Sequence, residues 1–208
     1  GSEMCIRDSS KGEWLEMFFS EEKISSSDIN SSSKIFEKVI VNDSEAPSSV
    51  PEAYLKLHLL SYRLVKPNET NLDGIFGVLK NIVWTSEGPF SVDDFRKKQM
   101  ETKEVNKHIL VHSVDKFPRM TDYVILSDVR IADANRVRLG AHLGPGTTVM
   151  HEGFVNFNAG SLGEAMIEGR ISQGVVIGDK TDIGGGASTM GTLSGGNEVK
   201  ISLGKNCL

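Results

Sequence analysis

Residues 139–149 read LGAHLGPGTTV, and residues 177–187 read IGDKTDIGGGA. Each stretch contains two pairs of a larger residue and a glycine, spaced six residues apart, and a fifth pair lies near the end of the chain. The five pairs are Leu139-Gly140, Pro145-Gly146, Ile177-Gly178, Ile183-Gly184 and Leu203-Gly204. A six-residue period is typical of a parallel β-helix. We therefore predict triangular coils of three hexads, with a turn at each glycine and the residue before it pointing inward.

Two gaps interrupt this repeat. The glycine of the second pair lies 32 positions before that of the third, and the glycine of the fourth pair lies 20 positions before that of the fifth. Neither gap is a multiple of six, so we expect the chain to leave the coil at residues 150–172 and 190–200. Because loops on a rigid scaffold commonly carry binding residues, these two segments are where the sequence predicts a site.

Glycine also divides the chain into two parts. Of the 21 glycines, 16 lie after residue 130, which places a boundary near residues 118–128. The sequence predicts an α+β N-terminal domain over residues 11–120 and a parallel β-helix over residues 121–208. The last hexad is unfinished, so we expect the β-helix to be incomplete at the C-terminus. Residues 1–10 match no periodic pattern, and we expect a non-native or disordered segment there.

The N-terminal part carries signals for helices and strands. Pro51, followed by regularly spaced apolar residues, predicts a helix over residues 51–65. A capping box that begins at Ser91 predicts a second helix up to about residue 102. Residues 75–84 and 108–114 are rich in β-branched side chains and predict strands, although the first segment could equally be helical.

Composition narrows the class of protein. The chain has 208 residues, of which 38% are hydrophobic, enough for one or two domains with a core. Its net charge of −5 argues against a nucleic-acid partner, and no apolar stretch approaches the roughly 20 residues that span a membrane. The two cysteines lie at opposite ends of the chain, which argues against a disulfide framework and favours a reducing, cytoplasmic location.

Six motifs in the second part carry a family resemblance. They are residues 129–133 (VRIAD), 138–143 (RLGAHL), 146–160 (GTTVMHEGFVNFNAG), 168–172 (EGRIS), 184–188 (GGGAS) and 190–196 (MGTLSGG). On these motifs the chain closely resembles the tetrahydrodipicolinate N-succinyltransferases, which are hexapeptide-repeat acyltransferases. The resemblance implies a left-handed β-helix behind an α/β domain, and a homotrimer with active sites between neighbouring subunits.

The resemblance also implies a reaction. Enzymes of this family move a succinyl group from succinyl-CoA to the amine of ring-opened tetrahydrodipicolinate, a step in diaminopimelate and lysine biosynthesis. We therefore expect small-molecule substrates, with no nucleic acid and no membrane. A hexapeptide-repeat acyltransferase that uses an acetyl donor is the first alternative.

Four residues match the family's site positions. Glu168 falls where the family places a catalytic carboxylate that attacks the thioester and forms an acyl-anhydride, and a general-base role on the amine is equally open. The resemblance implies that Arg170, Gly185 and Ser188 contact succinyl-CoA. Each also has a structural interpretation: the arginine can pair with a nearby acid, and the triple glycine at 184–186 can form a tight corner.

A magnesium ion on the trimer axis is a further implication of the resemblance. Glu152 matches one ligand position, but the companion position, an Asp in the family, is Asn135 here. Because hard cations prefer charged carboxylates, the neutral side chain argues against the metal in this chain.

Two other functions fit the repeat alone. His142 and His151 allow a hydratase of the γ-carbonic-anhydrase kind, although the β-helix contains no third histidine for a three-His zinc site. A purely structural β-helix is the non-enzymatic alternative, and the polar segment between residues 151 and 170 argues against it.

Overall fold

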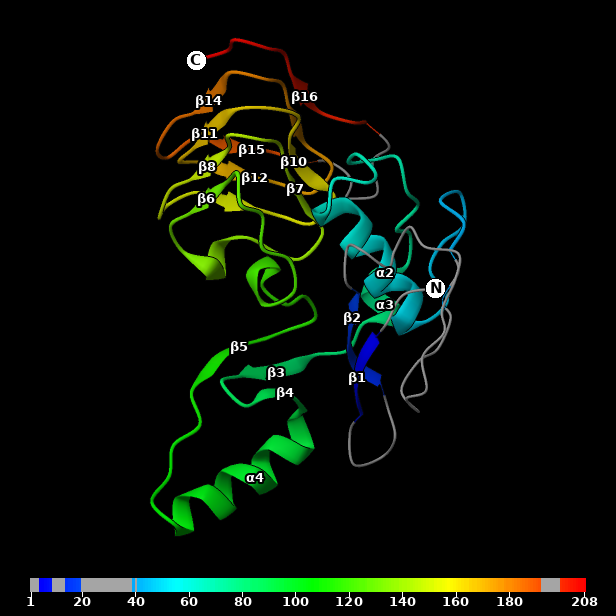
Figure 1. Ribbon diagram of the computed structural model, residues 1–208, viewed down its shortest axis with the longest axis vertical. Coiled ribbons are helices and arrows are strands. Elements are labelled where there is room, and N and C mark those ends of the chain that lie inside the picture. Colours follow the sequence, from blue (N-terminus) through cyan, green and yellow to red (C-terminus); the bar gives the residue numbers. More distant parts are fainter. Residues whose placement is uncertain (1–3, 9–13, 20–38, 40, 192–198) are drawn as a thin grey trace. The chain divides into compact units, whose positions relative to one another are not determined.

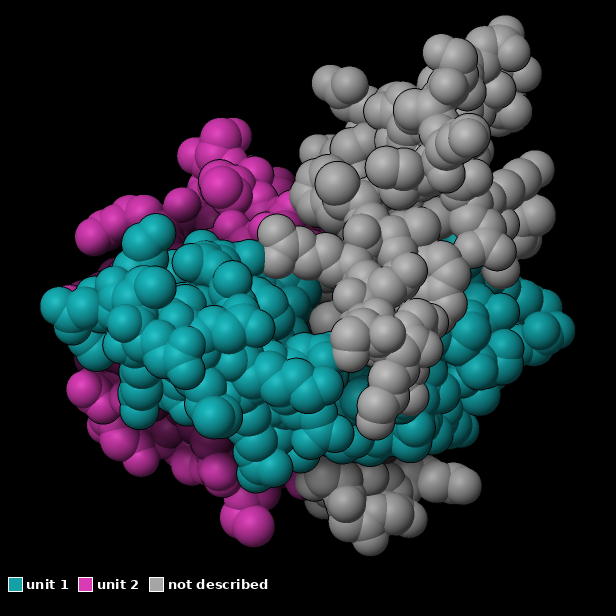
Figure 2. All heavy atoms as spheres, turned by 90° about the horizontal axis from the view of Figure 1, so that it is seen from below, with its two compact units in different colours: residues 1–55, 72–118 teal, residues 56–71, 119–208 magenta. Residues whose placement is uncertain are grey.

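The computed structural model describes residues 4–8, 14–19, 39, 41–191 and 199–208. The chain divides into two compact units, one formed by residues 1–55 and 72–118 and the other by residues 56–71 and 119–208 (Figure 2). The second unit takes up the chain at Arg119, near the boundary that glycine composition predicts. Its additional segment, 56–71, was not predicted. Across the described ranges, no helix has the length and apolarity needed to cross a membrane.

The first unit combines short helices with antiparallel strands. Its elements are β1 (Met4–Asp8), β2 (Trp14–Phe19), α3 (Ile75–Val78), β3 (Ile82–Thr85), β4 (Gly88–Ser91), α4 (Val92–Glu104) and β5 (Val111–Asp115). Strands β1 and β2 pair with each other, and a separate sheet has the order β4-β3-β5 (Figure 1). The segment 1–10, expected to be non-native or disordered, therefore contains a strand.

The helix predictions can be checked at their ends. Helix α4 begins as predicted, because the Ser91 hydroxyl accepts a hydrogen bond of 3.1 Å from the Asp94 backbone N–H. Helix α2 (Val50–Ser61) ends four residues earlier than the predicted 51–65. The backbone itself ends the helix here, because Arg63 has a φ of 64° and so cannot continue a right-handed helix.

The second unit contains a parallel β-helix of about three turns, which follows the α+β unit along the sequence. Its strands are β6 (Arg130–Ile131), β7 (Ala141–Leu143), β8 (Thr148–Val149), β9 (Phe154–Val155), β10 (Ala159–Ser161), β11 (Ala165–Ile167), β12 (Arg170–Ile171), β13 (Val176–Ile177), β14 (Thr181–Ile183), β15 (Ser188–Thr189) and β16 (Ser202–Leu203). From β7 on, every third strand stacks in one sheet, and β6 pairs with β8; the orders are β16-β13-β10-β7, β14-β11-β8-β6 and β15-β12-β9. All pairings are parallel, as a β-helix with three strands per coil requires (Figure 1).

The inside of the coils is mostly apolar, and the hexads predict part of it. Leu139, Leu143 and Ile177 are completely buried. Pro145 is exposed, so the prediction that it points inward is wrong. The inner position at that corner belongs to Thr147, whose hydroxyl lies 2.7 Å from that of Ser161.

The prediction of an excursion at residues 150–172 is also wrong. This segment holds β9 to β12, and each of these strands is paired within the coil. Ile167 pairs with Val149 in the coil before and with Ile183 in the coil after, at separations of 18 and 16 residues. Ile177 likewise stacks two coils after Leu143, 34 residues later, so one coil is two residues short. Gly178 therefore lines up with Gly144 and not with Gly146, which accounts for the other two residues missing from the 32-residue gap. Most of the other predicted excursion, 190–200, lies outside the described residues.

The segment 56–71 is bonded to the β-helix by two buried hydrogen bonds and by an exposed ion pair. The Ser61 hydroxyl accepts from the Gly140 N–H at 2.8 Å and donates to the Ala141 carbonyl at 3.0 Å. Arg63 forms an ion pair of 2.9 Å with Asp128. The two bonds of Ser61 satisfy backbone groups that water does not reach, which explains why this segment belongs to the second unit.

We expect Ser61→Ala to destabilise the protein by about 1–3 kcal/mol, because it leaves a buried N–H and a buried carbonyl unsatisfied. Urea denaturation followed by circular dichroism measures this change. Ser202→Ala, at an exposed serine of β16, is the matched control and should stay within about 0.5 kcal/mol of the native chain. Equal effects of the two substitutions would contradict the bridging role of Ser61.

Candidate active site

Corner lengths along one edge of the β-helix differ. The corner before β9 has four residues, 150–153, and the corner before β15 also has four, 184–187. The corner between them, before β12, has only Glu168 and Gly169. Because the strands on both sides of these corners remain paired, the short corner is set back between two longer ones.

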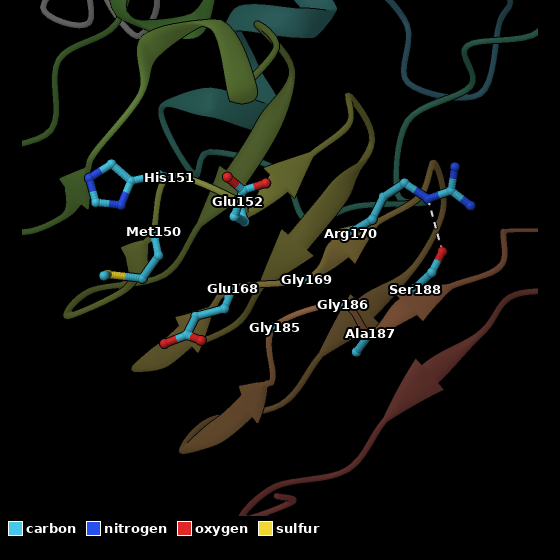
Figure 3. Close-up of a pocket in the computed structure, with 10 residues that line it drawn as sticks. All are labelled: Met150, His151, Glu152, Glu168, Gly169, Arg170, Gly185, Gly186, Ala187 and Ser188. Atoms are coloured by element: carbon cyan, nitrogen blue, oxygen red, sulfur yellow. Dashed lines mark hydrogen bonds between the residues drawn. The ribbon is translucent and has the colours of Figure 1, made fainter.

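This recess is a pocket of about 670 Å³ (Figure 3). It is lined by Met150, His151, Glu152, Glu168, Gly169, Arg170, Gly185, Gly186, Ala187 and Ser188. The structure therefore brings together all five residues that the resemblance assigns to catalysis, cofactor binding or metal binding. Four further lining residues were not predicted as part of a site: Met150, Gly169, Gly186 and Ala187. All four lie in the corners before β9, β12 and β15, so a comparison of corner lengths between coils could have found them.

The short corner is held tightly by the coil above it. The backbone N–H groups of Glu168 and Gly169 both donate to the Ile183 carbonyl, at 2.8 and 3.1 Å. A Cβ atom at position 169 would lie 2.5 Å from the Ala187 carbonyl oxygen, which is closer than atoms can approach. Only glycine therefore fits at this position, and the backbone that carries Glu168 has little freedom.

The Glu168 side chain is half-buried and extends into the pocket (Figure 3). Its carboxylate makes no hydrogen bond or ion pair with any residue in the described part of the chain. A Cβ atom built on Gly185 would lie 3.4 Å from the Glu168 Oε2 atom, so the glycine leaves this oxygen open. A free carboxylate of this kind can act as a nucleophile or as a general base.

Arg170 lies on the other side of Gly169, and its side chain extends away from Glu168 (Figure 3). Its Nε donates a hydrogen bond of 3.0 Å to the Ser188 hydroxyl. Among the described residues it forms no ion pair, so the interpretation that it serves only to neutralise a neighbouring acid has no support. Its guanidinium is exposed and can bind a carboxylate or a phosphate.

The residues considered for magnesium make other contacts. Glu152 faces Arg136 at 3.6 Å, and both side chains are well exposed. The Asn135 amide donates to the Asp133 carboxylate at 3.1 Å. Within the described ranges, no cluster of three or more His, Cys, Asp or Glu side chains could hold a metal. A carboxylate paired with a guanidinium and a companion residue that is a neutral amide do not fit a magnesium site, so we derive no chemical step through a metal.

The two histidines are placed differently. His151 is exposed at the pocket, whereas His142 is buried, with its Nδ1 atom 2.9 Å from the Ser161 carbonyl. A buried imidazole bonded to a backbone carbonyl is a structural group and not an accessible metal ligand. Only one of the two histidines considered for a zinc-dependent hydratase, His151, is therefore accessible to a metal.

Burial lowers the pKa of His142 below its ordinary value, and the Ser161 carbonyl, Arg63 and Glu69 modify that shift to a smaller extent. Because the folded state favours the neutral ring, this contribution to stability is present above the unfolded pKa of about 6.5 and is lost as the pH falls through the folded pKa. We expect His142→Asn to show a smaller loss of stability than the native chain between pH 7.5 and pH 5.

Urea midpoints at several pH values measure this effect. His151→Asn, at an exposed histidine, is the control and should keep the native pH dependence. Asp128 does not interfere, because the ordinary pKa of its carboxyl already lies below pH 5 and the hydrogen bond from Arg63 lowers it further. An unchanged pH dependence in His142→Asn would contradict the prediction.

Comparisons with known proteins decide the family. Residues 11–77 match the family model described as tetrahydrodipicolinate N-succinyltransferase N-terminal, and residues 79–119 match the one described as the middle region of the same enzyme. These two matches cover just over half of the chain. The chain belongs to the tetrahydrodipicolinate N-succinyltransferase family.

Individual members of the tetrahydrodipicolinate N-succinyltransferase family extend the match into the β-helix. The chain is 59% identical over 170 residues to 2,3,4,5-tetrahydropyridine-2,6-dicarboxylate N-succinyltransferase of Vibrio cholerae serotype O1, covering 82% of this chain and 50% of the relative. It is also 59% identical over 169 residues to the enzyme of the same name from Pseudomonas aeruginosa, covering 81% of this chain and 49% of the relative. The chain therefore spans about half the length of the curated relatives that it matches.

A solved structure supports the fold independently. A 2,3,4,5-tetrahydropyridine-2-carboxylate N-succinyltransferase structure from Campylobacter jejuni aligns with a TM-score of 0.74 at 43% sequence identity. The alignment covers 79% of this chain and 44% of that protein. Together with the three-strand coils, it confirms the predicted α+β unit followed by a left-handed parallel β-helix.

Proposed function

We propose that this protein transfers a succinyl group from succinyl-CoA to the amine of ring-opened tetrahydrodipicolinate, in the biosynthesis of diaminopimelate and lysine. The observation that carries the proposal is the recessed corner, where a carboxylate with no described partner and an exposed guanidinium line one pocket. The relatives at 59% identity, named for this reaction, supply the choice of donor and acceptor.

Glu168 is the catalytic residue in this proposal. As a nucleophile, its carboxylate attacks the thioester carbonyl, the carbon–sulfur bond breaks, and CoA leaves as the thiolate. The acceptor amine then attacks the resulting anhydride, the carbon–oxygen bond to Glu168 breaks, and the amide forms. The carboxylate is released, and the proton lost by the amine balances the charge of the CoA thiolate. As a general base, the same carboxylate instead takes the proton of the amine while the amine attacks the thioester directly.

The other pocket residues bind the donor in this proposal. Arg170 binds an anionic group of the acyl-CoA, since its guanidinium is exposed at the pocket. Gly185 leaves space for the donor beside Glu168, where a side chain would contact the carboxylate. We propose no role for a metal.

We also propose a homotrimer in a reducing, cytoplasmic setting. The family resemblance supports the trimer, since it implies active sites between neighbouring subunits. The sparse cysteine content supports the location. Light scattering of the purified protein tests the trimer directly.

The reaction itself is tested by following CoA release with tetrahydrodipicolinate as the acceptor and either succinyl-CoA or acetyl-CoA as the donor. Release that depends on succinyl-CoA and on the acceptor is the expected result. Release that is faster with acetyl-CoA would favour the acetyltransferase alternative. An absence of release with both donors would contradict the proposed function.

A further inference from the structure

We propose that Ser188 is a positioning residue: it holds the Arg170 guanidinium by its Nε, so that the outer edge with Nη1 and Nη2 binds an anionic group of the acyl donor. The inference rests on the proposed function, because that function supplies the acyl-CoA. It gives Ser188 a role that acts through Arg170 and does not require a bond from Ser188 to the donor.

The geometry of the two side chains supports this role. Arg170 and Ser188 are direct register partners in the ladder between β12 and β15. The Arg170 Nε donates to the Ser188 Oγ at 3.0 Å, which uses one of the five N–H donors of the guanidinium. Neither Nη atom has a partner among the described residues. The bond to Ser188 therefore restrains the side chain from one edge and leaves the opposite edge available.

The backbone beneath Arg170 is restrained by side-chain hydrogen bonds as well. The Thr189 hydroxyl donates to the Arg170 carbonyl at 2.8 Å, and the Ser172 hydroxyl donates to the Thr189 carbonyl at 2.6 Å. These bonds add to the backbone ladder between the same two strands. Both ends of the arginine side chain are thus fixed, although its guanidinium is exposed.

The charges of the pocket direct an anion to this end. Glu168 and Glu152 line the same pocket, and the side chains of Glu168 and Arg170 extend in opposite directions (Figure 3). An anion near the two carboxylates would be repelled, whereas the free edge of the guanidinium matches a carboxylate or a phosphate with two parallel hydrogen bonds. An arginine that is already restrained loses less conformational entropy when it binds.

Equilibrium binding of succinyl-CoA and acetyl-CoA, measured by calorimetry without acceptor, tests the inference. All proteins in this comparison also carry Glu168→Gln, so that no anhydride forms during the measurement. The variants are Ser188→Ala, Ser188→Thr, Arg170→Met and the double variant Ser188→Ala/Arg170→Met, with Ser202→Ala as an exposed control. We expect Ser188→Ala to weaken succinyl-CoA binding roughly three- to tenfold. Ser188→Thr retains the hydroxyl and should restore the affinity. Thermal unfolding should be unchanged in both single serine variants.

The double variant separates positioning from direct contact. If Ser188 acts through Arg170, Ser188→Ala should not weaken donor binding further in a protein that already carries Arg170→Met. If the two substitutions instead weaken binding independently, so that their fold-changes multiply, the inference is overturned. An unchanged affinity in Ser188→Ala would overturn it too. Weakening of succinyl-CoA alone would identify the acyl carboxylate as the anion on Arg170, and equal weakening of acetyl-CoA would identify a CoA phosphate.

A measurement without ligand keeps this inference distinct from the proposed function. Proton exchange of the Arg170 Nε–H, followed by nuclear magnetic resonance, should be faster in Ser188→Ala than in the native chain. If the native protein binds neither donor and exchange is still faster in Ser188→Ala, the proposed function is refuted, while the restraint of Arg170 by Ser188 is supported. Exchange that is equally fast in both proteins would refute the positioning.

Discussion

Glu168→Gln is expected to reduce the rate of succinyl transfer by about 10²- to 10⁴-fold if the carboxylate is a general base, and by more if it is the nucleophile. The substitution preserves the size of the side chain and removes its charge. Because the carboxylate has no partner in the described part of the chain, its loss should leave the fold intact. Steady-state CoA release with succinyl-CoA and tetrahydrodipicolinate measures the effect.

Glu164→Gln is the matched control for this substitution. Glu164 is an exposed glutamate in the turn before β11, within the same coil but outside this pocket. Its rate should remain within a factor of two of the native rate. Equal rates for Glu168→Gln and the native protein would place the chemistry on another residue.

The two roles of Glu168 can then be separated. Protein mixed with succinyl-CoA alone should carry a succinyl adduct on Glu168 if this residue is the nucleophile, and mass spectrometry after rapid acid quenching detects it. Turnover that depends on Glu168, with no adduct in the native protein and no CoA release before acceptor is added, would favour the general base.

Gly185→Val is expected to lower the transfer rate by more than tenfold, while Gly184→Val leaves it nearly unchanged. A Cβ atom at position 185 already lies within 3.4 Å of the Glu168 carboxylate, and the valine methyl groups extend further into the pocket. At position 184 a Cβ atom meets nothing within 4 Å among the described residues. Gly186 has a φ of 81°, whereas neither Gly184 nor Gly185 has a positive φ that would strain a valine backbone.

This pair of variants distinguishes two explanations for the triple glycine. If the glycines serve only to form a corner, both substitutions should destabilise the protein to a similar extent and change the rate little. If Gly185 keeps access to Glu168, its substitution should lower the rate without changing the thermal midpoint. Steady-state rates and thermal unfolding of both variants therefore decide between a structural and a functional role.

The part of the fold that sequence predicts best is the part with a strict period. Apolar residues at hexad positions, such as Leu139 and Ile177, have to be buried because water is excluded from the inside of a closed coil. The same rule failed at Pro145, since a Pro-Gly pair can form the corner itself while the next residue, Thr147, turns inward. The family was recognised from the β-helix motifs, whereas the family models match residues 11–119.

The sequence predicted residues of the candidate site but not the recessed corner of the β-helix in which they lie. Glu168 and Arg170 were known to be neighbours in sequence, yet the segment around them was expected to be an excursion. It is instead a regular coil, shortened by two residues at one corner. The spacing of glycines along the chain does not show this short corner. The corner becomes visible only when the residues that stack on one another in successive coils are compared.

The amino-acid sequence by itself determined the β-helix and the start of helix α4, because each depends on local spacing. Its motifs also predicted five candidate site residues. Only the tertiary structure decided that the corner at 168–169 is recessed, that Arg170 donates a hydrogen bond to Ser188, and that segment 56–71 is part of the second unit. Those features join residues far apart in the sequence. Stacking of coils creates them, and no local pattern records which residues will meet.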